Sequence, residues 1–115
     1  MQRLIFKIAD RDEFERAMAG GRYDGAAIDI ADGFIHFSTA AQARETADRH
    51  FAGREGLLLV AVDEAALGAA IKYEPSRGGD LFPHLFAPLE RNAVVWAVPL
   101  PIGSDGRHVF PDVVR

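Results

Sequence analysis

A histidine and two hydroxyl side chains lie close together in residues 34–39, Phe-Ile-His-Phe-Ser-Thr. Side chains alternate between the two faces of a strand, so His36 and Ser38 are expected to share one face. Histidine titrates near neutral pH, and a serine before a helix N-terminus lies where anions are favoured. The segment therefore predicts a corner for a phosphate, a carboxylate or a ribose hydroxyl. The alternative is that His36 is a core histidine, while Ser38 and Thr39 only cap a helix.

A second candidate is the sequence Arg77-Gly78-Gly79. Two consecutive glycines allow backbone amides to point toward one anion, and a guanidinium group matches the geometry of phosphate or carboxylate. These residues are therefore predicted to contact an anionic group. An ordinary turn is the alternative interpretation.

Glu74 and His84 are the remaining candidates for acid–base chemistry. Glu74 is expected at the end of a strand, where a general base or a ribose-binding carboxylate is often found. It could equally pair with Lys72 or Arg77 in solvent. His84 lies in an apolar segment, so it needs a hydrogen-bond partner and could be purely structural.

Metal binding ranks below nucleotide binding as an interpretation. His36, Glu74 and His84 together could coordinate a metal, but no expected helix carries histidines at metal-ligand spacing. We therefore assign no metal ligands. His50 and His108 are expected to be surface residues.

The composition predicts an ordinary globular protein. The chain has 115 residues, of which 49% are hydrophobic and 26% charged, and this predicts one domain over residues 1–115. The absence of cysteine excludes disulfides and thiolate sites and favours a reducing compartment, so we expect a cytoplasmic protein. The N-terminal residues do not resemble a signal peptide, and no apolar run approaches the roughly 18 residues of a membrane span. A net charge of -4 argues against non-specific nucleic-acid binding.

The first half of the chain predicts two strand–helix pairs. Residues 3–8 are expected to form a strand, and Asp10 with Glu13 predicts the start of a helix that ends near residue 19. Residues 22–31 are expected to form a loop with a short turn. Residues 34–37 predict a buried strand, and Thr39 with Gln42 predicts a second capped helix through about residue 51.

The second half predicts mostly strands. Residues 57–62 form a continuous apolar run typical of a central strand, and a short helical turn is expected from residue 63 to 67. Residues 71–74 predict a short strand that Pro75 stops, and residues 81–86 are placed at an edge or in a loop because of Pro83. Residues 93–98 predict the last strand, with Trp96 in the core and a tail that packs through Val109 and Phe110. The fold class is α+β, with mixed, mostly antiparallel sheets and two helices.

Several spaced motifs from the first strand to Trp96 resemble the domain-of-unknown-function 952 family. They are Asp32-Gly33-Phe34-Ile35-His36-Phe37-Ser38-Thr39, Gln42, Thr46-Ala47, Phe51-Ala52-Gly53, Tyr73-Glu74-Pro75-Ser76-Arg77-Gly78-Gly79, Phe82-Pro83-His84-Leu85 and Val94-Val95-Trp96.

This resemblance implies a fold similar to that of ADP-ribosyltransferases and tRNA 2′-phosphotransferases. Those proteins bind NAD or ADP-ribose in a cleft between two small sheets, and Lys7 stands where that wider group has His or Arg on the first strand. The resemblance places His36 and Ser38 at the cleft and directs Arg77 toward phosphate. The other candidates for ligand binding are Lys7, Thr39, Gly78 and Gly79. Glu74 and His84 become candidates for acid–base or ribose contacts.

Three hypotheses follow. The leading one is a small domain that binds a nucleotide or phosphorylated ligand of the NAD or ADP-ribose type in a cleft, with transferase activity as the further expectation. The second is a non-catalytic interaction domain in which the same residues keep a strand–loop corner rigid. The third is a metal-dependent hydrolase.

Overall fold

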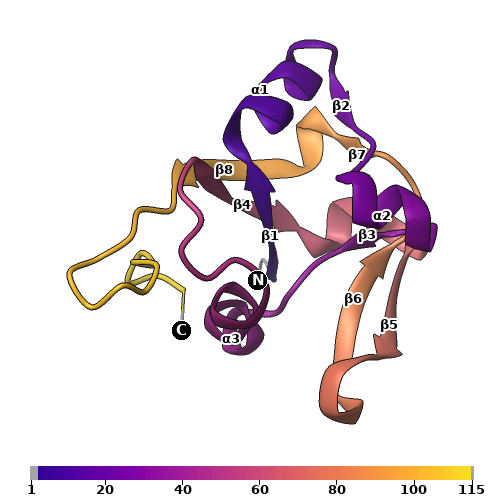
Figure 1. Cartoon of the computed structure of the whole chain (residues 1–115). Helices are drawn as coiled ribbons and strands as arrows, with labels where there is room; N and C mark the ends of the chain where they lie inside the picture. The colour runs from indigo at the N-terminus through magenta and orange to yellow at the C-terminus, as the bar shows by residue number, and fades with distance from the viewer. Residues whose placement is uncertain (1–2, 115) are drawn as a thin grey trace.

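A three-stranded antiparallel sheet forms the centre of the fold, with β4 (Leu57–Asp63) between β1 (Leu4–Asp10) and β8 (Val94–Pro99) (Figure 1). The computed structural model describes residues 3–114, except for the side chain of Arg77. Four consecutive β4 residues, 59–62, are fully buried. The strands predicted at residues 3–8, 57–62 and 93–98 are therefore confirmed, and β4 is the central one.

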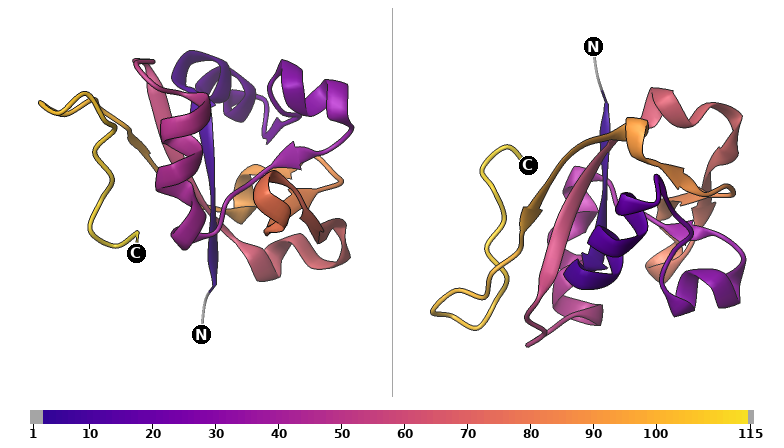
Figure 2. Two further views of the ribbon diagram at one scale, coloured as in Figure 1. Left: turned by 60° about the horizontal axis from the view of Figure 1, so that its bottom comes forward. Right: turned by 90° about the horizontal axis from the view of Figure 1, so that it is seen from above.

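One face of this sheet is covered by α3 (Ala40–His50) and the C-terminal tail (Figure 2). Ala43 and Ala47 have no exposed surface, so their small side chains let α3 lie close to the sheet. The amide of Thr39 donates to the side-chain carbonyl of Gln42 over 3.0 Å, which confirms the predicted cap. Phe110 is buried in the tail as predicted.

Two predictions for this region need correction. Val109 is 51% exposed because its neighbour Phe110 turns inward and places it on the solvent side. Trp96 is only half-buried, because it packs at the margin of the core on the outer strand β8.

The opposite face of the sheet is covered by α1 (Arg11–Ala19), which begins where β1 ends. A carboxylate oxygen of Asp10 accepts a hydrogen bond from the amide of Glu13 over 2.9 Å, as the capping pattern predicted. Phe14 and Tyr23 pack against each other in this core, with ring centroids 5.1 Å apart.

Residues 22–31, predicted as a loop, contain two regular elements. β2 (Arg22–Tyr23) pairs with β7 (Leu89–Glu90), and α2 (Ala27–Asp32) follows. The helix turns its apolar residues outward: Ile28 and Ile30 are 61% and 66% exposed, whereas Asp29 is 1% exposed. This reversed polarity hid the helix, because helix prediction relies on apolar residues facing the core.

A second antiparallel sheet has the order β3 (Ile35–His36), β6 (Leu81–Leu85) and β5 (Ile71–Pro75). The prediction that residues 81–86 lie at an edge or in a loop is wrong, because β6 is the middle strand. Pro83 is tolerated there because β3 ends at His36. The carbonyl of Pro83 accepts a hydrogen bond from the amide of Phe37 over 3.0 Å. The amide hydrogen that proline lacks would point past the end of β3, where no strand residue needs it. The β5–β6 hairpin extends away from the central sheet (Figure 1).

The two sheets meet at one backbone bridge between Phe6 and Ser38. Each residue donates its amide to the carbonyl of the other over 2.8 Å. The bridge places β3 and the first turn of α3 directly beside β1.

Three 3-10 helices complete the structure: η1 (Glu64–Ala70), η2 (Arg77–Gly79) and η3 (Arg91–Ala93). The helical turn expected to end at residue 67 therefore continues to Ala70. All strand pairs described are antiparallel, and α2 adds a third α-helix to the two predicted. The α+β class is confirmed. None of the helices within residues 3–114 has the length and apolar character needed to cross a membrane.

Gly25 is expected to be required at its position because any side chain there would collide with the buried Asp29. Its φ is +111°, and a Cβ added there would lie 2.7 Å from the Cβ of Asp29. Gly25→Ala should therefore lower the free energy of unfolding by about 3 kcal/mol in urea denaturation. Gly53 is the matched control, since its φ is +76° but an added Cβ would meet nothing within 4 Å. Gly53→Ala should cost only about 1 kcal/mol, and equal losses at the two positions would contradict the steric explanation.

Candidate functional site

The carboxylate of Asp29 on α2 is the centre of a buried polar cluster. Its Oδ2 lies 2.8 Å from the Nζ of Lys7 and accepts from the amide of Ala26 over 2.7 Å. Its Oδ1 lies 3.1 Å from the same Nζ and accepts from the amide of His36 over 3.1 Å. Oδ1 also lies 2.6 Å from the Nδ1 of His36. Asp29 therefore connects β1, α2 and β3.

The charges in this cluster stabilise one another. Burial alone would raise the pKa of Asp29, but the hydrogen bond from His36 and the charge of Lys7 outweigh it and hold that pKa well below its usual range. Burial lowers the pKa of the Lys7 ammonium, and the Asp29 carboxylate partly offsets this shift. An ionised Asp29 is thus a permanent acceptor for the ring of His36.

His36 lies between two carboxylates of the same helix. Its Nδ1 faces Asp29, and its Nε2 lies 3.0 Å from Oδ2 of Asp32. The His36 side chain is 35% exposed and that of Asp32 is 44% exposed, whereas that of Asp29 is fully buried. One contact of His36 is therefore internal and the other faces solvent.

His84 lies beside His36 in the second sheet. The two residues are opposite each other in the β3–β6 register, and their ring centroids are 5.6 Å apart. Nδ1 of His84 lies 2.8 Å from Oε1 of Glu74 on β5. Each histidine therefore has its Nδ1 fixed by a carboxylate, which orients the ring.

Phe34 and Phe86 form an aromatic surface next to the histidines. The Phe34 ring stacks on His84 with centroids 4.1 Å apart, and it lies 5.2 Å from Phe86. The ammonium of Lys72 lies 5.4 Å from the Phe86 centroid. A planar ligand could contact these rings while its polar groups reach the histidines.

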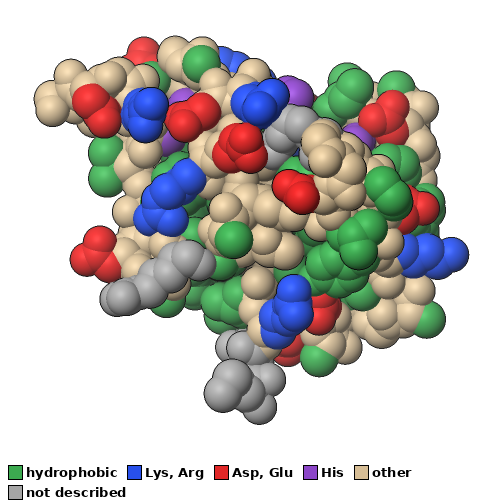
Figure 3. All heavy atoms as spheres, turned by 90° about the horizontal axis from the view of Figure 1, so that it is seen from below, with side chains coloured by type: hydrophobic (Ala, Val, Ile, Leu, Met, Phe, Trp, Pro, Cys, Tyr) green, Lys and Arg blue, Asp and Glu red, His purple; other side chains and the backbone are tan. Residues whose placement is uncertain are grey.

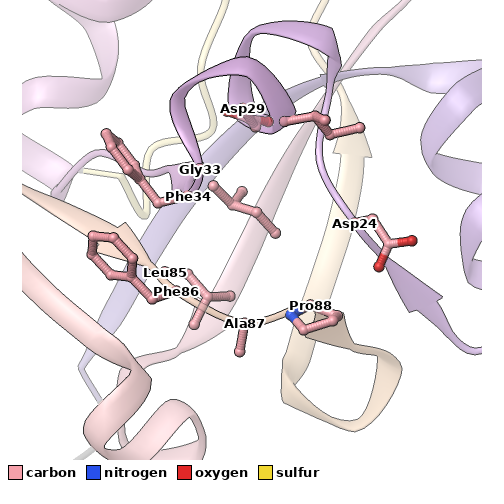
Figure 4. Close-up of a pocket in the computed structure, with 10 residues that line it drawn as sticks. Asp24, Asp29, Gly33, Phe34, Leu85, Phe86, Ala87 and Pro88 are labelled. Carbon is pink, nitrogen blue, oxygen red and sulfur yellow. The ribbon is translucent and has the colours of Figure 1, made fainter.

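A hollow of about 260 Å³ adjoins this aromatic surface. Figure 4 shows Phe34 and Phe86 on one side, Asp24 on the other and Pro88 at the rim. Asp24 supplies an exposed carboxylate, paired with Arg22 at 3.4 Å. The hollow thus combines aromatic and aliphatic walls with two aspartates, Asp24 and Asp29.

The structure brings together four of the predicted site residues, Lys7, His36, Glu74 and His84. Ser38 and Thr39 are not among them. The hydroxyl of Ser38 is 2.9 Å from that of Thr46 on α3, and Ser38 is only 5% exposed. The expectation that Ser38 shares a face with His36 is wrong, because β3 ends at His36 and the chain crosses to pair with β1.

Gly78 and Gly79 lie at the tip of the β5–β6 hairpin, and both have positive φ. The amide of Gly79 donates to the carbonyl of Ser76 over 2.9 Å and so closes the turn. That amide is occupied by the turn itself. The side chain of Arg77, predicted to contact phosphate, lies outside the described part of the structure.

Other polar residues were also placed differently from expectation. His108 is 9% exposed rather than a surface residue, because its Nε2 lies 2.8 Å from the carbonyl of Arg54.

Within residues 3–114, no group of three His, Asp or Glu side chains is arranged to hold a metal ion. On the face shown in Figure 3, the described positive and negative side chains are interspersed.

Sequence reasoning missed Asp29, Asp32 and Phe34 as functional candidates. One signal was present: Asp29 lies between two isoleucines, and Lys7 lies in an otherwise apolar strand. A lysine and an aspartate that each interrupt an apolar segment are candidates for a buried pair. For Asp32 and Phe34 the sequence offers only their place in the motif of residues 32–39.

The chain matches the family model described as "Protein of unknown function (DUF952)" over residues 8–97. It is also similar to protein CC0527 from Caulobacter crescentus. The crystal structure of that protein is 46% identical, with a TM-score of 0.88 over 92% of this chain and 93% of the other. Its solution NMR structure is 47% identical, with a TM-score of 0.82 over 90% of each chain. No curated protein matches the chain.

We expect the Lys7–Asp29 pair to dominate the stability of this region. Asp29→Asn leaves the Lys7 charge buried without a carboxylate, so the free energy of unfolding in urea should fall by about 3–5 kcal/mol. Adding Lys7→Met removes the unpaired charge and should restore part of that loss. Glu15→Gln, which breaks the exposed Arg11–Glu15 pair, is the control and should cost at most about 0.5 kcal/mol. A loss at Asp29 no larger than at Glu15 would contradict this interpretation.

Acidification should weaken the contribution of Asp29. The pKa of Asp29 is lower in the folded protein than the value of about 3.9 expected in the unfolded chain. The unfolded chain therefore binds more protons as the pH falls, and stability rises with pH in this interval. The stabilisation should be complete above about pH 5 and decrease below about pH 4. The difference in unfolding free energy between the wild type and Asp29→Asn should therefore become smaller as the pH falls below about 4. A difference that does not change with pH would show that the stabilisation does not come from the charge of Asp29.

Proposed function

We propose that this chain, which belongs to the DUF952 family, binds a nucleotide or another phosphorylated ligand of the NAD or ADP-ribose type beside His36 and His84. One observation carries the proposal: the two histidines are cross-strand neighbours, and each has its Nδ1 held by a carboxylate. The adjacent rings of Phe34 and Phe86 supply a stacking surface.

The size of the hollow supports a ring as the part of the ligand that enters it. Pockets for complete drug-sized ligands usually measure about 300–1,000 Å³. A hollow of about 260 Å³ therefore suits one planar ring system rather than a whole dinucleotide. The ribose and phosphate groups would extend toward His36 and Lys72 at the protein surface.

The histidine pair supports acid–base chemistry as the further step. A histidine whose Nδ1 donates to a carboxylate can use Nε2 to accept or donate a proton. His36 pairs with Asp29 in this way, and His84 pairs with Glu74. In a transfer reaction one histidine would take a proton from the attacking hydroxyl and the other would protonate the leaving group. An ADP-ribosyltransferase-like fold is part of the proposal for this chain, which has two three-stranded antiparallel sheets.

A non-catalytic interaction domain is the second candidate. His84 is only 4% exposed and stacks on Phe34, as expected for a structural histidine. Ile28 and Ile30 are exposed on α2, where a protein partner could cover them. This candidate predicts no response to nucleotides, and it predicts that loss of His36 destabilises the fold.

Ligand titration of the wild type and two histidine variants separates these functions. NAD, ADP-ribose and AMP should be tested by thermal shift and by NMR, with at least one raising Tm and shifting the His36 ring signals. His36→Asn keeps a donor toward Asp29 but removes Nε2, so it should retain the fold and bind about 10–100-fold more weakly. His50→Asn, on the exposed end of α3, is the matched control and should bind like the wild type.

The opposite pattern identifies the interaction domain. In that case none of the three nucleotides changes Tm or the His36 signals, and His36→Asn lowers Tm without any ligand effect.

A further inference from the structure

His36 carries two carboxylate contacts that differ in kind. Nδ1 makes a hydrogen bond with the buried Asp29, whereas Nε2 lies 3.0 Å from Oδ2 of the half-exposed Asp32. Ionised carboxylates only accept hydrogen bonds, so a proton on Nε2 would turn the second contact into an ion pair.

The two carboxylates are not equally fixed. Asp29 is held by Lys7, by the amide of Ala26 and by two donors of His36. Among the side chains that the structure describes, which do not include that of Arg77, His36 is the sole ion-pair partner of Asp32. Asp32 is also the last residue of α2, where the exposed carbonyl groups of a helix disfavour a negative charge. Asp32 can therefore leave His36 at a smaller cost than Asp29.

We propose that Nε2–H of His36 is the anion-binding donor of this site and that Asp32 occupies the anion position until a ligand phosphate replaces it. The inference rests on the proposed function, because it assigns the phosphate position of the same ligand. On binding, the phosphate oxygen accepts the Nε2–H hydrogen bond, and the Asp32 carboxylate turns into solvent. Asp29 continues to hold Nδ1, so the ring keeps its orientation.

The surrounding charges explain why such a competitor matters. Asp32 and Glu74 place negative charge beside the histidines, and Lys7 is engaged with Asp29. A phosphate must therefore overcome repulsion from Asp32 as well as displace it. Removing the Asp32 charge eliminates both obstacles and should strengthen phosphate binding.

Asp32→Asn and Asp48→Asn provide a matched comparison. Both variants remove one negative charge, but Asp48 is exposed on α3 and has no part in the histidine cluster. With AMP and inorganic phosphate as probes, Asp32→Asn should lower Kd by about fivefold or more, whereas Asp48→Asn should change it by less than about twofold. AMP and phosphate together show whether the phosphate group alone is sufficient.

The His36 ring provides a second readout in the unmodified protein. Side-chain ¹⁵N NMR should show both ring nitrogens protonated without ligand, and phosphate should shift Nε2 more than Nδ1. An unprotonated Nε2, or no Nε2 shift on saturation, would overturn the inference.

The outcomes also separate this inference from the proposed function. Binding of AMP to the wild type with no gain in Asp32→Asn, or with an equal gain in Asp48→Asn, overturns the inference alone. No binding of AMP, ADP-ribose or NAD to either the wild type or Asp32→Asn overturns both.

Discussion

The ion pair between Lys7 and Asp29 is the interaction on which the site depends. Both side chains are almost completely removed from water. Burial of two charges is costly unless the geometry is good and the remaining hydrogen-bonding positions are filled. Asp29 meets this condition because donors from β1, from the turn before α2 and from β3 all reach its two oxygens. The pair thus links β1, α2 and β3.

The regular parts of the fold could be predicted because their signals are local. The apolar run of β4 and the caps at Asp10 and Thr39 each depend on residues that are close in sequence. α2 could not be predicted in this way, because Asp29 faces inward toward Lys7, which lies 22 residues earlier in the sequence. β6 was misplaced for a similar reason: Pro83 is compatible with a middle strand only because β3 is two residues long.

In the candidate site, too, local signals could be predicted from the sequence and long-range placement could not. His36, Glu74 and His84 could be selected by residue type, but their proximity depends on the β3–β6–β5 order, which no local pattern indicates. Strand alternation predicts Ser38 on the same face as His36 only if the strand continues beyond His36. The actual chain leaves the second sheet at that point and pairs with Phe6, so Ser38 faces α3 instead. The face on which a side chain lies could therefore be predicted only within the actual length of its strand.

The close approach of Gly25 to Asp29 also limits how this sequence can change during evolution. A side chain at position 25 collides with Asp29, and loss of either charged partner strands the other in the core. A single substitution at position 7, 25 or 29 therefore gives a destabilised protein, so changes at the three positions depend on one another. The outward side of the same helix carries Ile28 and Ile30 and has no such restriction. Sequence divergence should consequently accumulate on the solvent side of α2 while its inner side stays fixed.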